Sequence, residues 1–283
     1  MFPLKSKYLV YVLLFVFAVL PLLAGIGFAI LYSFGLVGVL NNGFTLEHWK
    51  KVFEEGNVTS SFLYSAAIAF ASLIISVSLA LLISLKYHKA FSKGIVSYLI
   101  YMPLAFPGIV ASFFFFQLLT KSGVLSRIAY RLNIINTIDE FPDLINDAYG
   151  IGMITTHVFL SFPFFVLLFV NIIKTERIGE YQQLASTLAA SKWQNLFRVS
   201  IPMIFKKALP NILLYFIFIF GAFEVPLLLG RSNPETVSIL AVRKLQRFNL
   251  LDIPQGYAIA ALYTFFVFTL LIFLFKLKLK NEA

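Results

Sequence analysis

Residues 150–173 read GIGMITTHVFLSFPFFVLLFVNII, a run that contains no Asp, Glu, Lys or Arg, and Lys174 follows it directly. An α-helix rises about 1.5 Å per residue, so about 20 apolar residues are enough to cross the roughly 30 Å hydrocarbon core of a bilayer. This stretch therefore predicts a membrane-spanning helix that ends at a charged boundary.

Similar stretches recur along the whole chain. With this one, six spans are predicted, at about residues 8–32, 62–85, 95–119, 150–173, 208–230 and 256–275. The composition agrees, because 60% of the residues are hydrophobic, 13% are charged and the mean hydropathy is +0.88. A water-soluble domain of this length could not cover its core with so few polar residues. We expect an all-α integral membrane protein whose residues 1–283 form a single transmembrane domain.

The charged residues predict the orientation of the spans. Fourteen Lys and Arg against three acids fall on the side that carries both termini, and nine against nine fall on the other side. Basic residues accumulate on the cytoplasmic side of membrane proteins. We therefore expect both termini and the loop 174–207 to be cytoplasmic, in a multi-pass protein of the inner or plasma membrane. Since the net charge of +10 is scattered at span ends, it does not indicate a nucleic-acid partner.

The loop 174–207 is the one long segment on the cytoplasmic side, and it reads KTERIGEYQQLASTLAASKWQNLFRVSIPMIFKK. Its apolar residues recur at helical spacing in two pieces, which predicts two short amphipathic helices. Ser191 is a candidate N-cap of the second helix, and Pro202 marks its expected end. Such a helical pair suits docking into a groove of a partner protein.

The same loop resembles the "EAA" loop of ABC importer permeases. Gln183-Leu184-Ala185 stands where E-A-A is expected, Ala189-Ala190-Ser191 where G-A-S is expected, and Trp193, Phe197 and Pro202 match directly. Gln183 lacks the usual carboxylate, and Ala189 replaces the usual glycine. Residues 101–109 and 221–230 also resemble segments of these permeases, and the nearest branch is the spermidine and putrescine permeases.

This resemblance implies a membrane-spanning permease subunit that carries a small polar solute, with a polyamine preferred and iron(III), thiamine or sulfate as alternatives. It also implies the partners, namely a separate ATPase that grips the loop, a second identical or different permease subunit, and an extracytoplasmic binding protein. The chain has no G-x-x-x-x-G-K-[ST] phosphate loop, so we expect no enzymatic activity and no cofactor in it, with ATP and Mg²⁺ bound by the ATPase. A stand-alone secondary transporter remains the alternative, since it too would show six spans and interrupted helices.

Four residues inside the predicted spans are candidates for the translocation path. Glu224 is the only acid placed within a span, next to Phe223 and Pro226, and His157 is the only histidine there. Ionisable groups at membrane depth often mark a transport path. Each has a structural alternative, because Glu224 can cap backbone groups freed by Pro226 and His157 can bond a neighbouring helix.

Overall fold

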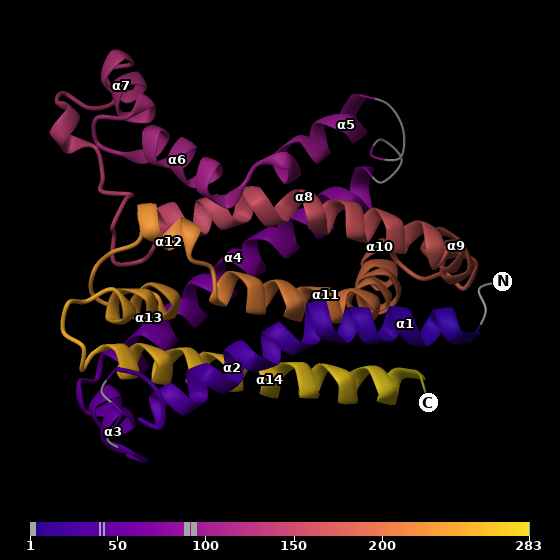
Figure 1. The fold of residues 1–283 in the computed structure, drawn as a ribbon. Coiled ribbons are helices and arrows are strands. Elements are labelled where there is room, and N and C mark those ends of the chain that lie inside the picture. The colour runs from indigo at the N-terminus through magenta and orange to yellow at the C-terminus, as the bar shows by residue number, and fades with distance from the viewer. Residues whose placement is uncertain (1–3, 40, 42, 88–90, 92–94, 283) are drawn as a thin grey trace. The chain divides into compact units, whose positions relative to one another are not determined.

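The structure is a computed structural model that describes residues 4–39, 41, 43–87, 91 and 95–282. All regular elements in these ranges are helices (Figure 1). Six of them are long and apolar enough to cross a membrane: Tyr8–Ser33, Asn57–Tyr87, Gly108–Arg131, Ile151–Thr175, Lys192–Phe220 and Ile253–Lys276. The prediction of an all-α protein with six spans is confirmed. Lys89 and Lys93, two of the basic residues assigned to the cytoplasmic side, lie outside the described residues.

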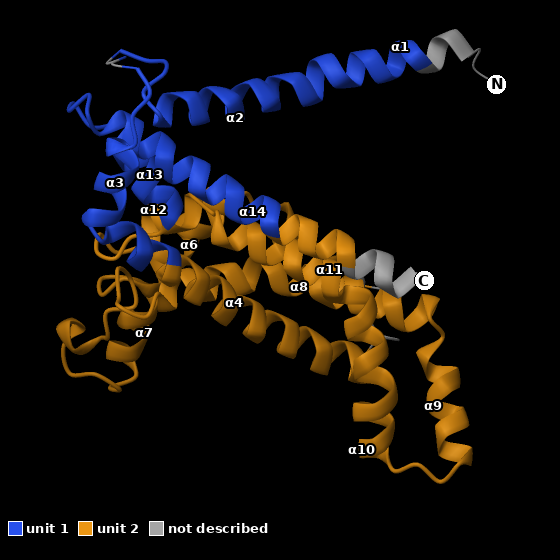
Figure 2. Ribbon diagram, turned by 90° about the horizontal axis from the view of Figure 1, so that it is seen from below, with its two compact units in different colours: residues 1–62, 237–269 blue, residues 63–236, 270–283 orange. Residues whose placement is uncertain are grey.

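The helices group into two compact units (Figure 2). Unit 1 comprises Met1–Phe62 and Val237–Thr269, and unit 2 comprises Leu63–Thr236 and Leu270–Ala283. Two long helices, α4 (Asn57–Tyr87) and α14 (Ile253–Glu282), contribute residues to both units.

Unit 1 contains the first span, built from α1 (Leu4–Leu14), a π-helical turn (Phe15–Val19) and α2 (Leu20–Ser33). It also contains α3 (Glu47–Glu54), α13 (Val237–Leu245) and the first part of α14. The end of α2 is held by aromatic packing, since the ring centroids of Tyr32 and Tyr257 are 4.6 Å apart and those of Phe28 and Tyr257 are 5.7 Å apart.

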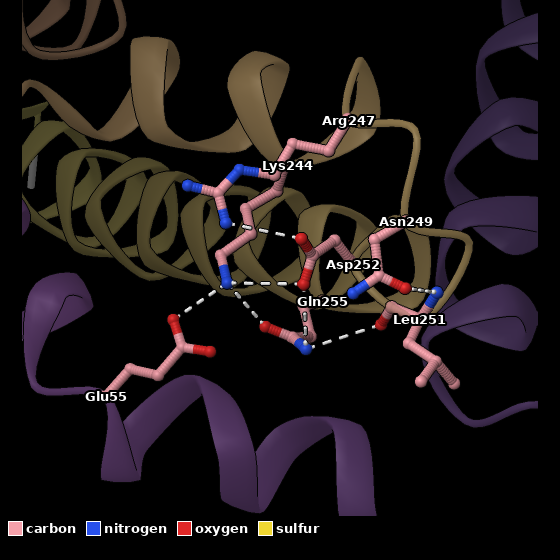
Figure 3. Close-up of polar contacts among 7 residues, drawn as sticks. All are labelled: Glu55, Lys244, Arg247, Asn249, Leu251, Asp252 and Gln255. Atoms are coloured by element: carbon pink, nitrogen blue, oxygen red, sulfur yellow. Dashed lines mark hydrogen bonds and ion pairs between the residues drawn. The ribbon is translucent and has the colours of Figure 1, made fainter.

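A polar network joins three segments of unit 1 around the buried side chain of Lys244 (Figure 3). Lys244 Nζ lies 2.7 Å from Glu55 Oε2, just after α3, and donates to Gln255 Oε1 of α14, also at 2.7 Å. Asp252 Oδ1 lies 3.7 Å from the same ammonium group, while Arg247 pairs with the other Asp252 oxygen at 3.2 Å. A buried charge is tolerated where it is paired and hydrogen-bonded in this way.

Unit 2 is built on α4, α8 (Ile151–Thr175) and α11 (Ile201–Phe220), with the shorter α6 (Gly108–Leu119) and α12 (Glu224–Leu229) packed against α8. α7 (Val124–Arg131) and a 3-10 turn (Ile138–Glu140) follow α6. The core is a cluster of buried apolar side chains: Ile68, Phe115, Leu119, Met153, Val225 and Leu229.

The third span differs from the prediction of one helix over residues 95–119. α5 (Ile95–Tyr101) leads into a 3-10 turn (Met102–Ala105), and α6 then leaves in a new direction, so that α5 and α6 form a V (Figure 1). The break falls at Phe106, whose backbone is extended with φ −79° and ψ 124°. The ring of Pro107 disfavours a helical conformation for the residue before it, which explains the break.

The fifth span also differs, because it begins earlier and ends earlier than residues 208–230. A continuous helical segment runs from Lys192 through Phe220, and α12 is a separate short helix. The expectation that Pro202 ends a loop helix is wrong, since Pro202 lies in the first turn of α11 directly after the π-helical turn Asn195–Ser200. The missing N–H of a proline is tolerated where the hydrogen-bond pattern changes from π to α.

Candidate functional site

The loop 174–207 forms a helical hairpin at one end of unit 2 (Figure 2). Its first arm is α9 (Ile178–Thr187), and its second arm is α10 (Lys192–Gln194) with the π-helical turn that continues into α11. α9 packs against α8, and its first residue, Ile178, is fully buried. Lys207 of α11 also pairs with Glu176, after α8, at 3.0 Å. The second arm thus continues directly into a membrane span, and the first arm follows α8 after a short turn at Arg177.

The turn between the arms has the hydrogen bonds of a Schellman motif. The N–H of Ala190 donates to the carbonyl of Ala185 at 3.0 Å, and the N–H of Ala189 donates to Ser186 at 3.1 Å. In this motif the residue at the Ala189 position adopts the left-handed conformation, usually as glycine. Ala189 has φ +59°, so this alanine adopts a conformation that glycine usually provides in this motif. The turn keeps its geometry at the cost of backbone strain.

The second arm begins where the sequence predicted, at Ser191. Its hydroxyl accepts from the backbone N–H of Gln194, while the Gln194 side chain accepts from the N–H of Ser191 at 2.8 Å. This reciprocal capping box confirms Ser191 as an N-cap.

Polar side chains hold the two arms together. Gln182 of α9 donates to the hydroxyl of Ser200 at 2.7 Å, and Asn195 donates to the hydroxyl of Ser186 at 3.0 Å. Asn195 also reaches the carbonyl of Gln182 at 3.3 Å. Because these amides bridge the arms, the hairpin is a defined structure and not a loose loop.

The outer surface of the hairpin is unusually apolar. Five large side chains on it are more than half exposed, and we call them the hairpin patch: Tyr181, Leu184, Leu188, Trp193 and Phe197. Trp193 and Phe197 stack on each other with centroids 5.7 Å apart and planes at 13°. Of the other predicted coupling residues, Gln183 and Ala189 are exposed, Ala185 and Ala190 are half-buried, and Pro202 lies beyond the hairpin in α11. An exposed apolar patch of this kind marks a contact surface.

A second candidate site lies where the two interrupted spans meet. α6 begins at Gly108, α12 begins at Glu224, and the two helices pack together. Glu224 Oε2 lies so close to Gly108 that a Cβ atom there would collide with it. Glu224 is exposed, and no ion pair of its carboxylate occurs among the described residues. A carboxylate beside the start of α6 is favoured by the positive end of the helix dipole.

The remaining path candidates are placed differently. Phe223 is half-buried beside Glu224, and Pro226 is buried in the first turn of α12, where a missing N–H is not needed. His157 lies in α8, and only 3% of its surface is exposed. Within the described ranges, no cluster of three or more His, Asp or Glu could hold a metal ion.

The sequence did not predict the contact between Gly108 and Glu224. Each lies at a break in a span, and nothing in a linear pattern says that two breaks lie at one place. The sequence did contain a sign of the strained backbone at Ala189, because alanine stands there in place of the glycine that the resemblance leads one to expect.

Comparisons with known proteins agree with this arrangement. The family model described as "Binding-protein-dependent transport system inner membrane component" matches residues 72–278. The molybdenum transport system permease protein ModB of Azotobacter vinelandii is 26% identical over 185 residues, which cover 65% of this chain and 77% of that protein. The fold is similar, with a TM-score of 0.65 and 16% identity, to a chain in the crystal structure of a bacterial ABC transporter involved in the import of the acidic polysaccharide alginate. That match covers 98% of this chain and 96% of the other.

Proposed function

Because the chain belongs to the family of binding-protein-dependent transport system inner membrane components, we propose that it is the membrane-spanning permease subunit of an ABC importer. It is a multi-pass inner-membrane protein, and its six spans act as one membrane domain with both termini in the cytoplasm. A binding protein delivers the solute from the outer side, and a second permease subunit completes the path.

The observation that carries this proposal is the hairpin patch. Leu188, with 83% of its surface exposed, and Trp193, with 71%, stand on a hairpin braced by its own hydrogen bonds. A preorganised apolar surface binds a partner without a further cost of ordering. We assign that partner as the cytoplasmic ATPase, which receives the residues around Gln183, Ala185 and Ala190. Gln183 binds it through neutral hydrogen bonds, since it has no carboxylate.

The connection of the hairpin to the spans supports a coupling role. α8 leads into the first arm, and the second arm continues without interruption into α11. A displacement of the hairpin by the ATPase is therefore passed to two spans as a rigid-body movement. ATP and Mg²⁺ bind the ATPase, and this chain contributes no cofactor and no catalytic residue.

The substrate is proposed here only as a small polar solute. The relatives named above concern molybdenum transport and alginate import, and neither name mentions a polyamine. Within the path we place Glu224, Phe223 and Pro226 at the junction of α6 and α12. The position of Glu224 against Gly108 favours a structural role over that of a cation ligand, because the positive end of the α6 dipole stabilises a carboxylate there.

Copurification tests the ATPase assignment. Leu188→Asp places a charge in the contact and should remove the ATPase from the purified chain, while the chain itself still inserts into the membrane. Leu132→Asp is the matched control, since Leu132 is also an exposed leucine, at 64%, and lies outside the hairpin. We expect this control variant to retain the ATPase.

Retention of the ATPase by Leu188→Asp would refute the docking surface. Solute uptake by the purified chain alone, driven by an ion gradient without ATP, would instead establish a secondary transporter.

A further inference from the structure

Two spans of unit 2, α4 and α8, share a buried polar seam. The hydroxyls of Ser76 and Ser161 lie 2.7 Å apart, and Ser84 donates to the carbonyl of Val166 at 3.3 Å. Tyr64 reaches the carbonyl of Asp147, just before α8, at 3.4 Å. Residues later in α4 bond residues later in α8, so the two helices run parallel.

This register places Ser72 opposite His157. Ser76 and Ser161 are 85 positions apart. Ser72 and His157 are also 85 positions apart. Ser72 lies four residues, about one helical turn, before Ser76, and His157 lies four residues before Ser161. Ser72 is fully buried and His157 is 3% exposed. Ser72 Oγ and His157 Nε2 are nevertheless without a hydrogen-bond partner among the described residues.

The side chain of Ser72 does not use the bond that its own helix offers. Other hydroxyls in the spans donate to the carbonyl four residues earlier, as Ser112 does to Gly108 at 2.7 Å and Thr156 does to Gly152 at 2.8 Å. The Ser72 hydroxyl makes no such bond, although it is fully buried. A polar atom in this position needs a partner that protein atoms do not supply.

We propose that a water molecule binds between Ser72 and His157 and bridges Ser72 Oγ to His157 Nε2. Buried waters occupy such places, where two or more polar groups would otherwise remain unsatisfied in an apolar interior. With neutral imidazole, the water donates to Nε2 and accepts from the hydroxyl, and its second hydrogen can reach a neighbouring seam oxygen. Lipid offers no substitute for these bonds, so the site is specific to the packed helix pair.

The water site gives the seam a mechanical role, which rests on the function proposed above. α8 contains Pro163, which interrupts its own hydrogen-bond ladder two residues after Ser161. The proposed bridge at Ser72 and the bond of Ser76 hold the part of α8 before Pro163 against α4, and the bond of Ser84 holds the part after it. α8 can then transmit the movement of the hairpin without bending at Pro163.

The sign of a stability change tests the water bridge. If Ser72 Oγ is bridged, Ser72→Ala removes a bond and should lower the melting temperature of the purified protein by about 2–4 °C. If the hydroxyl is unsatisfied, the same change removes a buried polar group without a loss, and the melting temperature should rise. A rise would overturn the proposal.

A double-variant cycle gives a second, independent measurement. Ser72→Ala and His157→Leu together should lower the melting temperature by less than the sum of the single changes, because they remove one shared bridge. Ser112→Ala combined with His157→Leu is the matched control and should be additive, since Ser112 bonds its own helix. Additivity of the Ser72 and His157 changes would overturn the bridge.

Measurements of transport and ATPase binding distinguish a failure of the water bridge from a failure of the proposed function. Ser72→Ala should also lower solute transported per ATP hydrolysed, at unchanged ATPase binding. If the wild-type chain binds no ATPase, the proposed function fails, while the melting measurements still decide the water site.

Discussion

Gly108, the first residue of α6, lies directly against the carboxylate of Glu224, the first residue of α12, and a Cβ atom at this position would collide with that carboxylate unless it moved. Two spans that are interrupted at separate points of the sequence thus meet at one place. A break in a membrane helix leaves backbone groups that need partners. Here the two breaks lie together, and the Glu224 carboxylate supplies negative charge at the beginning of α6.

Gly108→Ala should displace the Glu224 side chain and leave the fold intact, because the colliding atom is the flexible end of that side chain. We expect transport in membrane vesicles to fall several-fold at unchanged expression. Glu224→Ala in the same chain should restore part of the loss by making room. Gly25→Ala is the control, since no atom lies within 4 Å of the added Cβ, and it should leave transport unchanged.

Glu224→Gln keeps the size of the side chain and removes its charge. A carboxylate at a helix N-terminus contributes about 0.3–1 kcal/mol, so a structural role predicts a decrease in transport of about two- to five-fold. The assay is uptake by membrane vesicles at saturating binding protein. A decrease of more than about tenfold, confined to cationic solutes, would instead identify Glu224 as a ligand of the substrate.

Ala189→Gly should relieve the left-handed backbone of the hairpin turn. The strain of a non-glycine residue in this conformation is about 1 kcal/mol, so hydrogen exchange of the turn amides should slow about fivefold. Mass spectrometry of the exchanged peptide measures this directly. Ala190→Gly is the contrast, because Ala190 does not have a positive φ, and exchange there should become faster.

Lys244→Met should destabilise unit 1, because it leaves Glu55 and Gln255 without the buried ammonium group that both contact. Loss of hydrogen bonds to a charged group costs about 1.5–3 kcal/mol, and thermal unfolding of the purified chain should detect it. Lys50→Met removes the exposed pair with Glu54 and should cost at most about 1 kcal/mol. Equal effects of the two changes would show that the network contributes no more than a surface pair.

Cysteine labelling tests the orientation of the spans, and the absence of natural cysteines makes it direct. Ser191→Cys should react with an impermeant maleimide only in inside-out vesicles, and Ser232→Cys only in intact cells. Both serines are exposed. Reaction of Ser191→Cys from outside would reverse the orientation predicted from the basic residues.

The sequence predicted most of the elements of this fold. Each of the six spans was found from the length of an apolar run, because the bilayer imposes that length whatever the neighbouring helices do. The N-cap at Ser191 was also predicted, since a capping box depends on residues three positions apart. The third and fifth spans were each predicted as one helix, and the structure divides both, at Phe106 and after Phe220.

What the sequence by itself determined is therefore the set of spans and the hairpin, which both depend on local chemistry. Only the tertiary structure decided that Gly108 meets Glu224, that Ser76 bonds Ser161, and that Lys244 is buried against Glu55. The physical reason lies in the solvent. In water, an apolar stripe shows which face of a helix is buried, but in a bilayer lipid-facing and protein-facing surfaces are both apolar. Partner and register are then set by small and polar residues that become recognisable only when the helices are packed.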